Sequence, residues 1–344
     1  MRLAAVIAVA VVAQAVAAAP PGPGAARPAT PPASGDAADS AFRGLSLSRA
    51  RTLLPGFDDC GDVVCLIERA YAADPRARQL ALAMWNERGD LAGVGPDEIM
   101  DGGYRGKIHL VPQLPIGAHR KHLQWVAEAM RSIDEFFRAA FADRPAPRYR
   151  WRGLAFRFVR SVGKRTPSAY AIGWAVERSE TGGGDPDGSA GGAGGGAPRG
   201  IEYNVAGSLL TSAAGVREML IHELFHDNDE DHGDWSARRF QADYAAILAR
   251  CGRRPAVACL APYAPNTTMV RGGTFYAFQQ DNGNAVHEYA AELAVRYFRE
   301  QGEMLAAGKL AGRAFKCGPA ENARAWQALV DEFFAGRDLV PACS

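Results

Sequence analysis

Apolar residues recur at intervals of three or four along much of the chain, and this spacing is typical of helices that bury one face. The long predicted helices cover residues 118–141, 211–227, 235–250, 284–303 and 321–334. Two shorter helices are predicted within residues 62–88, separated near Pro75. The pattern therefore predicts a helix-rich C-terminal half.

Four short segments have the alternating apolar and polar pattern of half-buried strands. They cover residues 107–111, 154–162, 170–176 and 201–205. These strands precede most of the long helices along the chain. That order favours an α+β fold, in which strands and helices occupy different parts of the sequence.

The N-terminal segment has the composition of a secretory signal peptide. Residues 1–19 combine a short basic start, an apolar run and small residues at the end. Residues 20–44 are rich in Pro, Ala and Gly and resemble a flexible linker. Residues 45–344 are enough for one large domain, in which we expect a Gly-rich disordered loop at 181–200. The protein is thus predicted to be secreted, either extracellular or periplasmic.

The overall charge narrows the range of partners. A formal net charge of +1 gives no reason to expect nucleic acid or an anionic membrane surface as a partner. After the signal peptide, no segment is apolar for long enough to cross a bilayer, so no stable membrane insertion is expected.

Six cysteines in an exported chain predict disulfide bonds. Their spacing favours Cys60 with Cys65 and Cys251 with Cys259, because both pairs close short loops, and this leaves Cys317 for Cys343. The pairing is the simplest of about fifteen that six cysteines allow.

The strongest chemical signal is His222-Glu223-Leu224-Phe225-His226, an HExxH sequence in a predicted helix. A spacing of four puts both imidazoles on one helix face, about one turn apart, where two nitrogens can bind one zinc ion. Glu223 then stands beside them in the position of a general base.

At this motif the chain resembles the zincin metallopeptidases, and the resemblance covers about residues 200–300. It implies a small twisted sheet over an active-site helix, followed by a helical C-terminal subdomain. It also implies that His222 and His226 bind one catalytic Zn²⁺ and that Glu223 polarises a zinc-bound water. The strand at 201–205 would be the sheet edge to which an extended peptide substrate adds its backbone.

A catalytic zinc site takes three protein ligands, and two residues compete for the third place. His232 completes the histidine spacing of the metzincins, HExxHxxGxxH, but Asp229 stands where that clan has its turn-forming glycine. Glu288 lies in a segment similar to the ExxxE of gluzincins, in which Glu292 would support a metal-binding histidine. We favour Glu288, since this assignment accounts for both acids, and keep His232 as the alternative.

These residues predict a secreted zinc endopeptidase with a peptide or protein substrate. Tyr276, after a Gly-rich stretch, is the candidate donor to the oxyanion, with Tyr203, Tyr263 and Tyr289 as rivals. One alternative is a zinc amidase that acts on a non-protein or cell-wall amide. The other is a non-catalytic secreted binding protein with a relic HExxH.

Overall fold

The computed structural model describes residues 45–101, 106–163, 169–172, 200–252, 256–270, 273–279 and 285–343. By its internal contacts the chain divides into two units, Met1–Ser40 and Ala41–Ser344, and the described residues all belong to the second. The predicted signal peptide, the linker and residues 181–199 of the predicted loop lie outside the described residues. Gly200, which we expected to end that loop, is the first residue of a strand.

Six strands form one mixed sheet in the described part of the chain. They are β1 (Leu91–Val94), β2 (Glu98–Asp101), β3 (Lys107–Pro112), β4 (Ala155–Val162), β5 (Ala169–Ile172) and β6 (Gly200–Asn204). The order is β2-β3-β4-β6-β5, and β1 also pairs with β4. Strand β4 runs parallel to β1 and β6, whereas the other pairs are antiparallel.

The expectation that residues 201–205 form the sheet edge is wrong. Strand β6 pairs with β4 on one side and with β5 on the other, so β5 is the terminal strand at that end of the described sheet. The polar residues that made β6 look half-exposed are buried and paired. Glu202 forms an ion pair with Arg157, and Asn204 accepts a hydrogen bond from the Ser161 backbone N–H.

The described helices lie close to the predicted positions, and the fold is α+β, as the order of elements predicts. They are α2 (Leu47–Leu53), α3 (Val63–Ala70), α4 (Pro75–Arg88), α5 (Arg120–Ala140), α6 (Ala213–Asp231), α7 (Trp235–Cys251), α8 (Val257–Leu260), α9 (Ala285–Ala307) and α10 (Ala320–Phe333), with 3₁₀ turns η2 (Gly117–His119), η3 (Tyr276–Phe278) and η5 (Phe315–Cys317). The prediction missed α2, α8, β1 and β2, which are too short for a clear period. None of these helices is long and apolar enough to span a bilayer.

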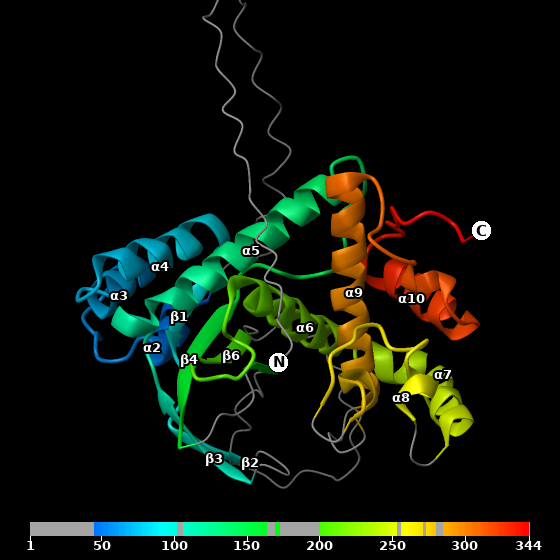
Figure 1. Ribbon diagram of the computed structural model, residues 1–344. Coiled ribbons are helices and arrows are strands. Elements are labelled where there is room, and N and C mark those ends of the chain that lie inside the picture. Colours follow the sequence, from blue (N-terminus) through cyan, green and yellow to red (C-terminus); the bar gives the residue numbers. More distant parts are fainter. Residues whose placement is uncertain are drawn as a thin grey trace, which may run out of the picture. The chain divides into compact units, whose positions relative to one another are not determined.

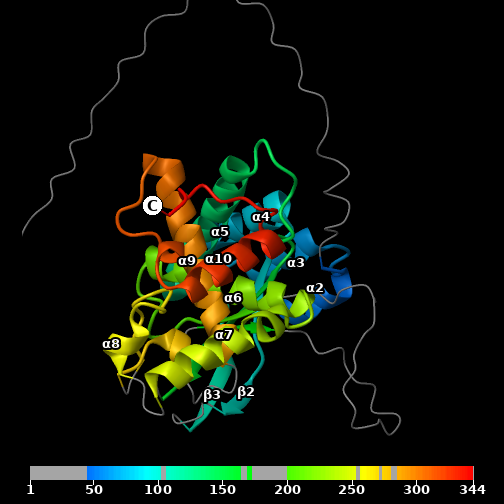
Figure 2. The ribbon, with the colours of Figure 1, turned by 90° about the vertical axis from the view of Figure 1, so that its right-hand side faces the viewer.

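Helices α5 and α6 lie side by side, and both contact the sheet region (Figure 1). His122 of α5 is 2.9 Å from the Tyr203 hydroxyl of β6, and α6 contacts β5 and β6. Helix α9, orange in Figure 1, packs against both α5 and α6. Figure 2 shows α10 and α7 on the side that faces the viewer, and both contact α9. The arrangement holds the middle of α6 between the sheet and α9.

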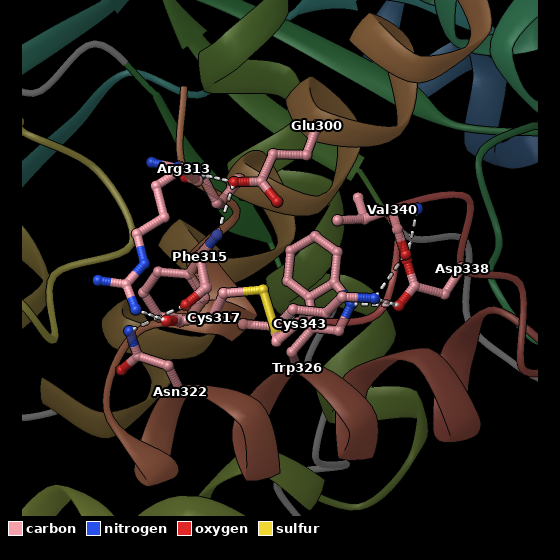
Figure 3. Close-up of a disulfide and its surroundings, with 11 residues drawn as sticks. Glu300, Arg313, Phe315, Cys317, Asn322, Trp326, Asp338, Val340 and Cys343 are labelled. Carbon is pink, nitrogen blue, oxygen red and sulfur yellow. Dashed lines mark hydrogen bonds and ion pairs between the residues drawn. A yellow bond between two sulfur atoms is a disulfide. The ribbon is translucent and has the colours of Figure 1, made fainter. Parts of the chain in front are cut away.

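Three disulfides join the predicted cysteine pairs: Cys60–Cys65, Cys251–Cys259 and Cys317–Cys343. The last fastens the C-terminal segment to η5 (Figure 3). Beside it, the Asp338 carboxylate accepts hydrogen bonds from Trp326 Nε1 at 2.9 Å and from Lys316 Nζ at 2.6 Å. These contacts fix the end of the chain against α10.

Candidate metal centre

The HExxH sequence lies in α6, a helix whose start and buried face are both set by its own sequence. The Ser212 side chain caps the N-terminus by accepting from the Gly215 N–H. Val216, Leu220 and Leu224 form an i, i+4 row with exposed fractions of 0, 0 and 1%. Burial of this row fixes the rotation of the helix about its axis, so the two histidines turn together toward α9.

His222 and His226 approach each other as the spacing predicts. Their Nε2 atoms are 3.1 Å apart. His222 is buried, and His226 is half-buried. Glu288, in the first turn of α9, completes the group: its Oε2 lies 3.0 Å from His222 Nε2 and 3.7 Å from His226 Nε2. Among the described residues, these three form the group of metal-binding side chains whose donor atoms all lie within 4.8 Å of one another.

The chemistry and spacing of these donors fit a zinc ion. Two imidazoles and one glutamate are a known catalytic zinc set, and tetrahedral ligands at 2.0–2.1 Å from the metal are about 3.3 Å apart. The separations of 3.0, 3.1 and 3.7 Å lie around that value. Comparison with protein-family models, curated proteins and solved structures finds no match for this chain.

Glu292, one turn after Glu288 on α9, stands behind the first histidine. Its Oε1 lies 3.3 Å from His222 Nδ1, the ring nitrogen that faces away from the donor cluster. Only 7% of Glu292 is exposed. A carboxylate in this position fixes the tautomer and orientation of the ring, because Nδ1–H donates to it and leaves the Nε2 lone pair free for a metal.

The charges of the cluster depend on one another. Burial alone would lower the pKa of His222, but its hydrogen bonds with Glu288 and Glu292 raise that pKa well above its ordinary value. Burial would likewise raise the pKa of Glu288, whereas the two histidines hold it far below the usual range. Attraction between the histidines and Glu288 thus favours their close approach.

His232 does not join this cluster. It is the C-cap of α6, its Nδ1 lies 2.6 Å from Glu332 Oε1 of α10, and its ring packs against Phe333. The metzincin spacing needs a turn at Asp229, but α6 stays helical through Asp231. Helix α6 extends beyond the predicted end at residue 227 because the Asp229 carboxylate is buried against other helices. The structure therefore brings Glu288, and not His232, to the histidine pair.

Glu223 and Tyr276 lie at the same centre. Glu223 follows His222 on α6 and is 8% exposed. Tyr276, in η3, has its ring centroid 5.6 Å from that of His222. Burial, with the charges of Glu288 and Glu223, raises the pKa of the Tyr276 phenol far above its ordinary value. Tyr276 therefore keeps its proton and can donate it in a hydrogen bond.

The rival tyrosines have other neighbours. The Tyr203 hydroxyl is paired with His122, and the Tyr263 hydroxyl accepts a hydrogen bond from Arg250. Tyr289 is buried in an aromatic group with Tyr244 and Phe278. Of the four candidates, Tyr276 is the one whose ring contacts a residue of the cluster.

Two residues near the centre have contacts that the sequence-based prediction did not foresee: Asp229, considered there only as a departure from the metzincin glycine, and Asn266, which was not considered. The buried Asp229 side chain contacts α7 and α9, and the buried Asn266 side chain contacts Glu292. No spacing rule predicts either set of contacts. The sequence held one weak signal: a buried acid or amide side chain needs a hydrogen-bond partner, but its burial is not visible in the sequence.

Proposed function

We propose that this protein is a secreted zinc-dependent endopeptidase of the zincin type, which hydrolyses peptide bonds. The observation that carries the proposal is the convergence of His222 Nε2, His226 Nε2 and Glu288 Oε2 from two helices, with Glu223 next to them. A histidine pair at this spacing with a glutamate from a separate helix is the donor set of a hydrolytic zinc centre.

His222, His226 and Glu288 would hold the zinc ion, which when bound would supply Lewis acidity toward a carbonyl and a water molecule. Glu223 is the base that takes a proton from the attacking water and passes it to the leaving amine. Tyr276 donates its phenolic hydrogen to the oxygen that becomes negative in the transition state. Glu292 keeps His222 Nδ1 protonated and its ring in place.

The sheet edge supports a peptide as the substrate. Strand β5 ends the described sheet and contacts α6, the helix that carries Glu223. An extended chain that pairs with the outer side of β5 would run beside that helix, with its backbone hydrogen-bonded to the strand. A small mixed sheet next to a metal-binding helix is also the arrangement that the zincin resemblance implies.

Three disulfides support an oxidising location, because such bonds are rare in the cytosol. They agree with the signal peptide predicted at residues 1–19. We therefore propose that the protein acts outside the cytoplasm, in the periplasm or the extracellular space.

The test uses the exported protein, purified without its signal peptide. We expect about one zinc ion per chain by elemental analysis and cleavage of members of a mixed peptide library. Glu223→Gln should abolish cleavage while zinc remains bound, since the amide keeps the size of the side chain but cannot accept the proton. A wild-type protein without bound zinc would refute the proposal. Bound zinc without peptide cleavage would point to another amide as the substrate.

A further inference from the structure

Asn266 contacts the metal centre from behind Glu292. It lies in the segment between α8 and η3 and is 6% exposed. Its Nδ2 donates to the backbone oxygen of Glu292 at 2.8 Å and to Glu292 Oε2 at 2.9 Å. A single amide nitrogen thus holds both the backbone and the side chain of Glu292.

The orientation of this amide follows from its partners. Both atoms that face Asn266 are oxygens that accept hydrogen bonds, so the nitrogen must point toward them. A rotated amide would set its oxygen against two others. Asn266 Oδ1 has no hydrogen-bond partner in the part of the chain that the structure describes, so nothing there favours the reverse orientation.

A directed chain of hydrogen bonds follows from this orientation. Asn266 donates to Oε2 of Glu292, and Oε1 of the same carboxylate lies 3.3 Å from His222 Nδ1. The carboxylate accepts at both ends, so Nδ1 of His222 carries a hydrogen, and Nε2, which faces Glu288, is the nitrogen that would bind a metal. We propose that Asn266 is a positioning residue that sets the tautomer and ring orientation of His222 through Glu292.

The same residue connects the centre to the segment that carries Tyr276. Two residues after Asn266, the Thr268 backbone oxygen accepts from the Tyr276 N–H at 2.8 Å, and Met269 forms a β-bridge with Phe275. Asn266 therefore fastens the start of this segment to α9, while the Tyr276 ring at its end lies 5.6 Å, centroid to centroid, from the His222 ring. One side chain aligns both a metal-binding histidine and the oxyanion donor.

The inference rests on the proposed function, and zinc affinity tests it without a substrate. Asn266→Asp keeps the shape of the side chain but sets a carboxylate against the two oxygens of Glu292. Asn266→Ala removes the donor without adding charge and serves if the Asp variant does not fold. Both should bind zinc about 10- to 100-fold more weakly in competition with a chelator, as loss of an outer partner of a metal histidine does.

Asn322 provides a matched control. It is also a buried asparagine whose Nδ2 donates to two backbone oxygens, those of Pro262 and Phe315, and whose Oδ1 has no partner among the described residues. Asn322→Ala should lower the thermal midpoint as Asn266→Ala does but leave zinc affinity unchanged.

In zinc-loaded protein, the His222 Nδ1–H proton resonance should be sharp in the wild type and broadened by solvent exchange in Asn266→Ala.

The outcomes separate the two proposals. If the wild type binds zinc and Asn266→Ala binds it as tightly, the role of Asn266 is wrong and the proposed function stands. Equal loss of affinity in Asn322→Ala would mean that general loosening of the fold is the cause, and would also overturn the inference. If the wild type binds no zinc, the proposed function itself fails.

Discussion

Asp229 of α6, which is buried, and His287 of α9, which is half-buried, form an ion pair with Oδ2 and Nδ1 2.8 Å apart. The Asp229 carboxylate also accepts from the Ser236 N–H at 2.7 Å and from Ser236 Oγ at 2.5 Å. Ser236 lies in the first turn of α7, whose own N-cap side chain makes no capping bond. Asp229 therefore caps α7 and joins α6 to α9. It lies about one turn after His226 on α6, and its partner His287 directly precedes Glu288 on α9.

Replacement of Asp229 should be costly for stability. We expect Asp229→Ala to reduce the free energy of unfolding by about 3–5 kcal/mol, because it leaves His287 and the α7 N-terminus without their buried partner. Urea denaturation measures this loss. Glu218→Ala removes the same charge from an exposed position on α6 and should change stability by about 0.5 kcal/mol or less. Similar losses in the two variants would show that the buried contact has no special importance.

The third ligand can be identified by paired substitutions. Glu288→Ala should weaken zinc binding by more than the roughly 100-fold upper range of outer partners, because it removes a donor atom. His232→Ala should retain zinc, since the His232 ring lies at the C-terminal end of α6 and is paired with Glu332 of α10. Chelator competition measures both. Retained affinity in Glu288→Ala together with loss in His232→Ala would reverse the assignment.

Tyr276 should act in the chemical step and not in metal binding. Tyr276→Phe removes one donor to the oxyanion and should reduce kcat by about 10²- to 10³-fold, with zinc content unchanged. Tyr263→Phe is the control, because that hydroxyl is also hydrogen-bonded but to Arg250. Steady-state kinetics on a cleaved peptide distinguishes the variants. A kcat for Tyr276→Phe within a factor of two of the wild type would exclude this role.

Acid should destabilise the fold through His122. Burial, with the charges of Lys121 and His119, lowers the pKa of this histidine to about 4. The unfolded chain, with a pKa near 6.5, binds the proton more tightly, so stability falls as pH drops from about 6.5 to about 4, by about 3 kcal/mol in total. His122→Gln should flatten this part of the stability profile measured by denaturant midpoints.

Local spacing was sufficient to predict part of the centre. The four-residue interval of His222 and His226 and the matching interval of Glu288 and Glu292 each lie within one helix, whose geometry is the same everywhere. The disulfide pairs were predictable for a similar reason, since two of the loops are short. These features depend little on the rest of the fold.

Features that depend on contacts between distant elements were not predictable. The end of α6 is set by the contacts of Asp229 with α7 and α9, so the sequence alone could not choose between a turn and a further helical turn at that point. The position of β6 depends on β5, which pairs with its other side. Asn266 acts on Glu292, 26 residues away, and no spacing rule links an asparagine in a loop to a glutamate in a helix.

The separation of the donors along the chain has a consequence for biosynthesis. Glu288 follows His222 by 66 residues, so α9 can reach α6 only after the whole intervening segment has been synthesised. A nascent chain that has emerged as far as the HExxH sequence holds two of the three donors and lacks Glu292 and Asn266. The proposed zinc centre would thus be completed only when α9 docks on α6, so that, if the proposed activity is correct, the growing polypeptide would carry no complete peptidase site during translation.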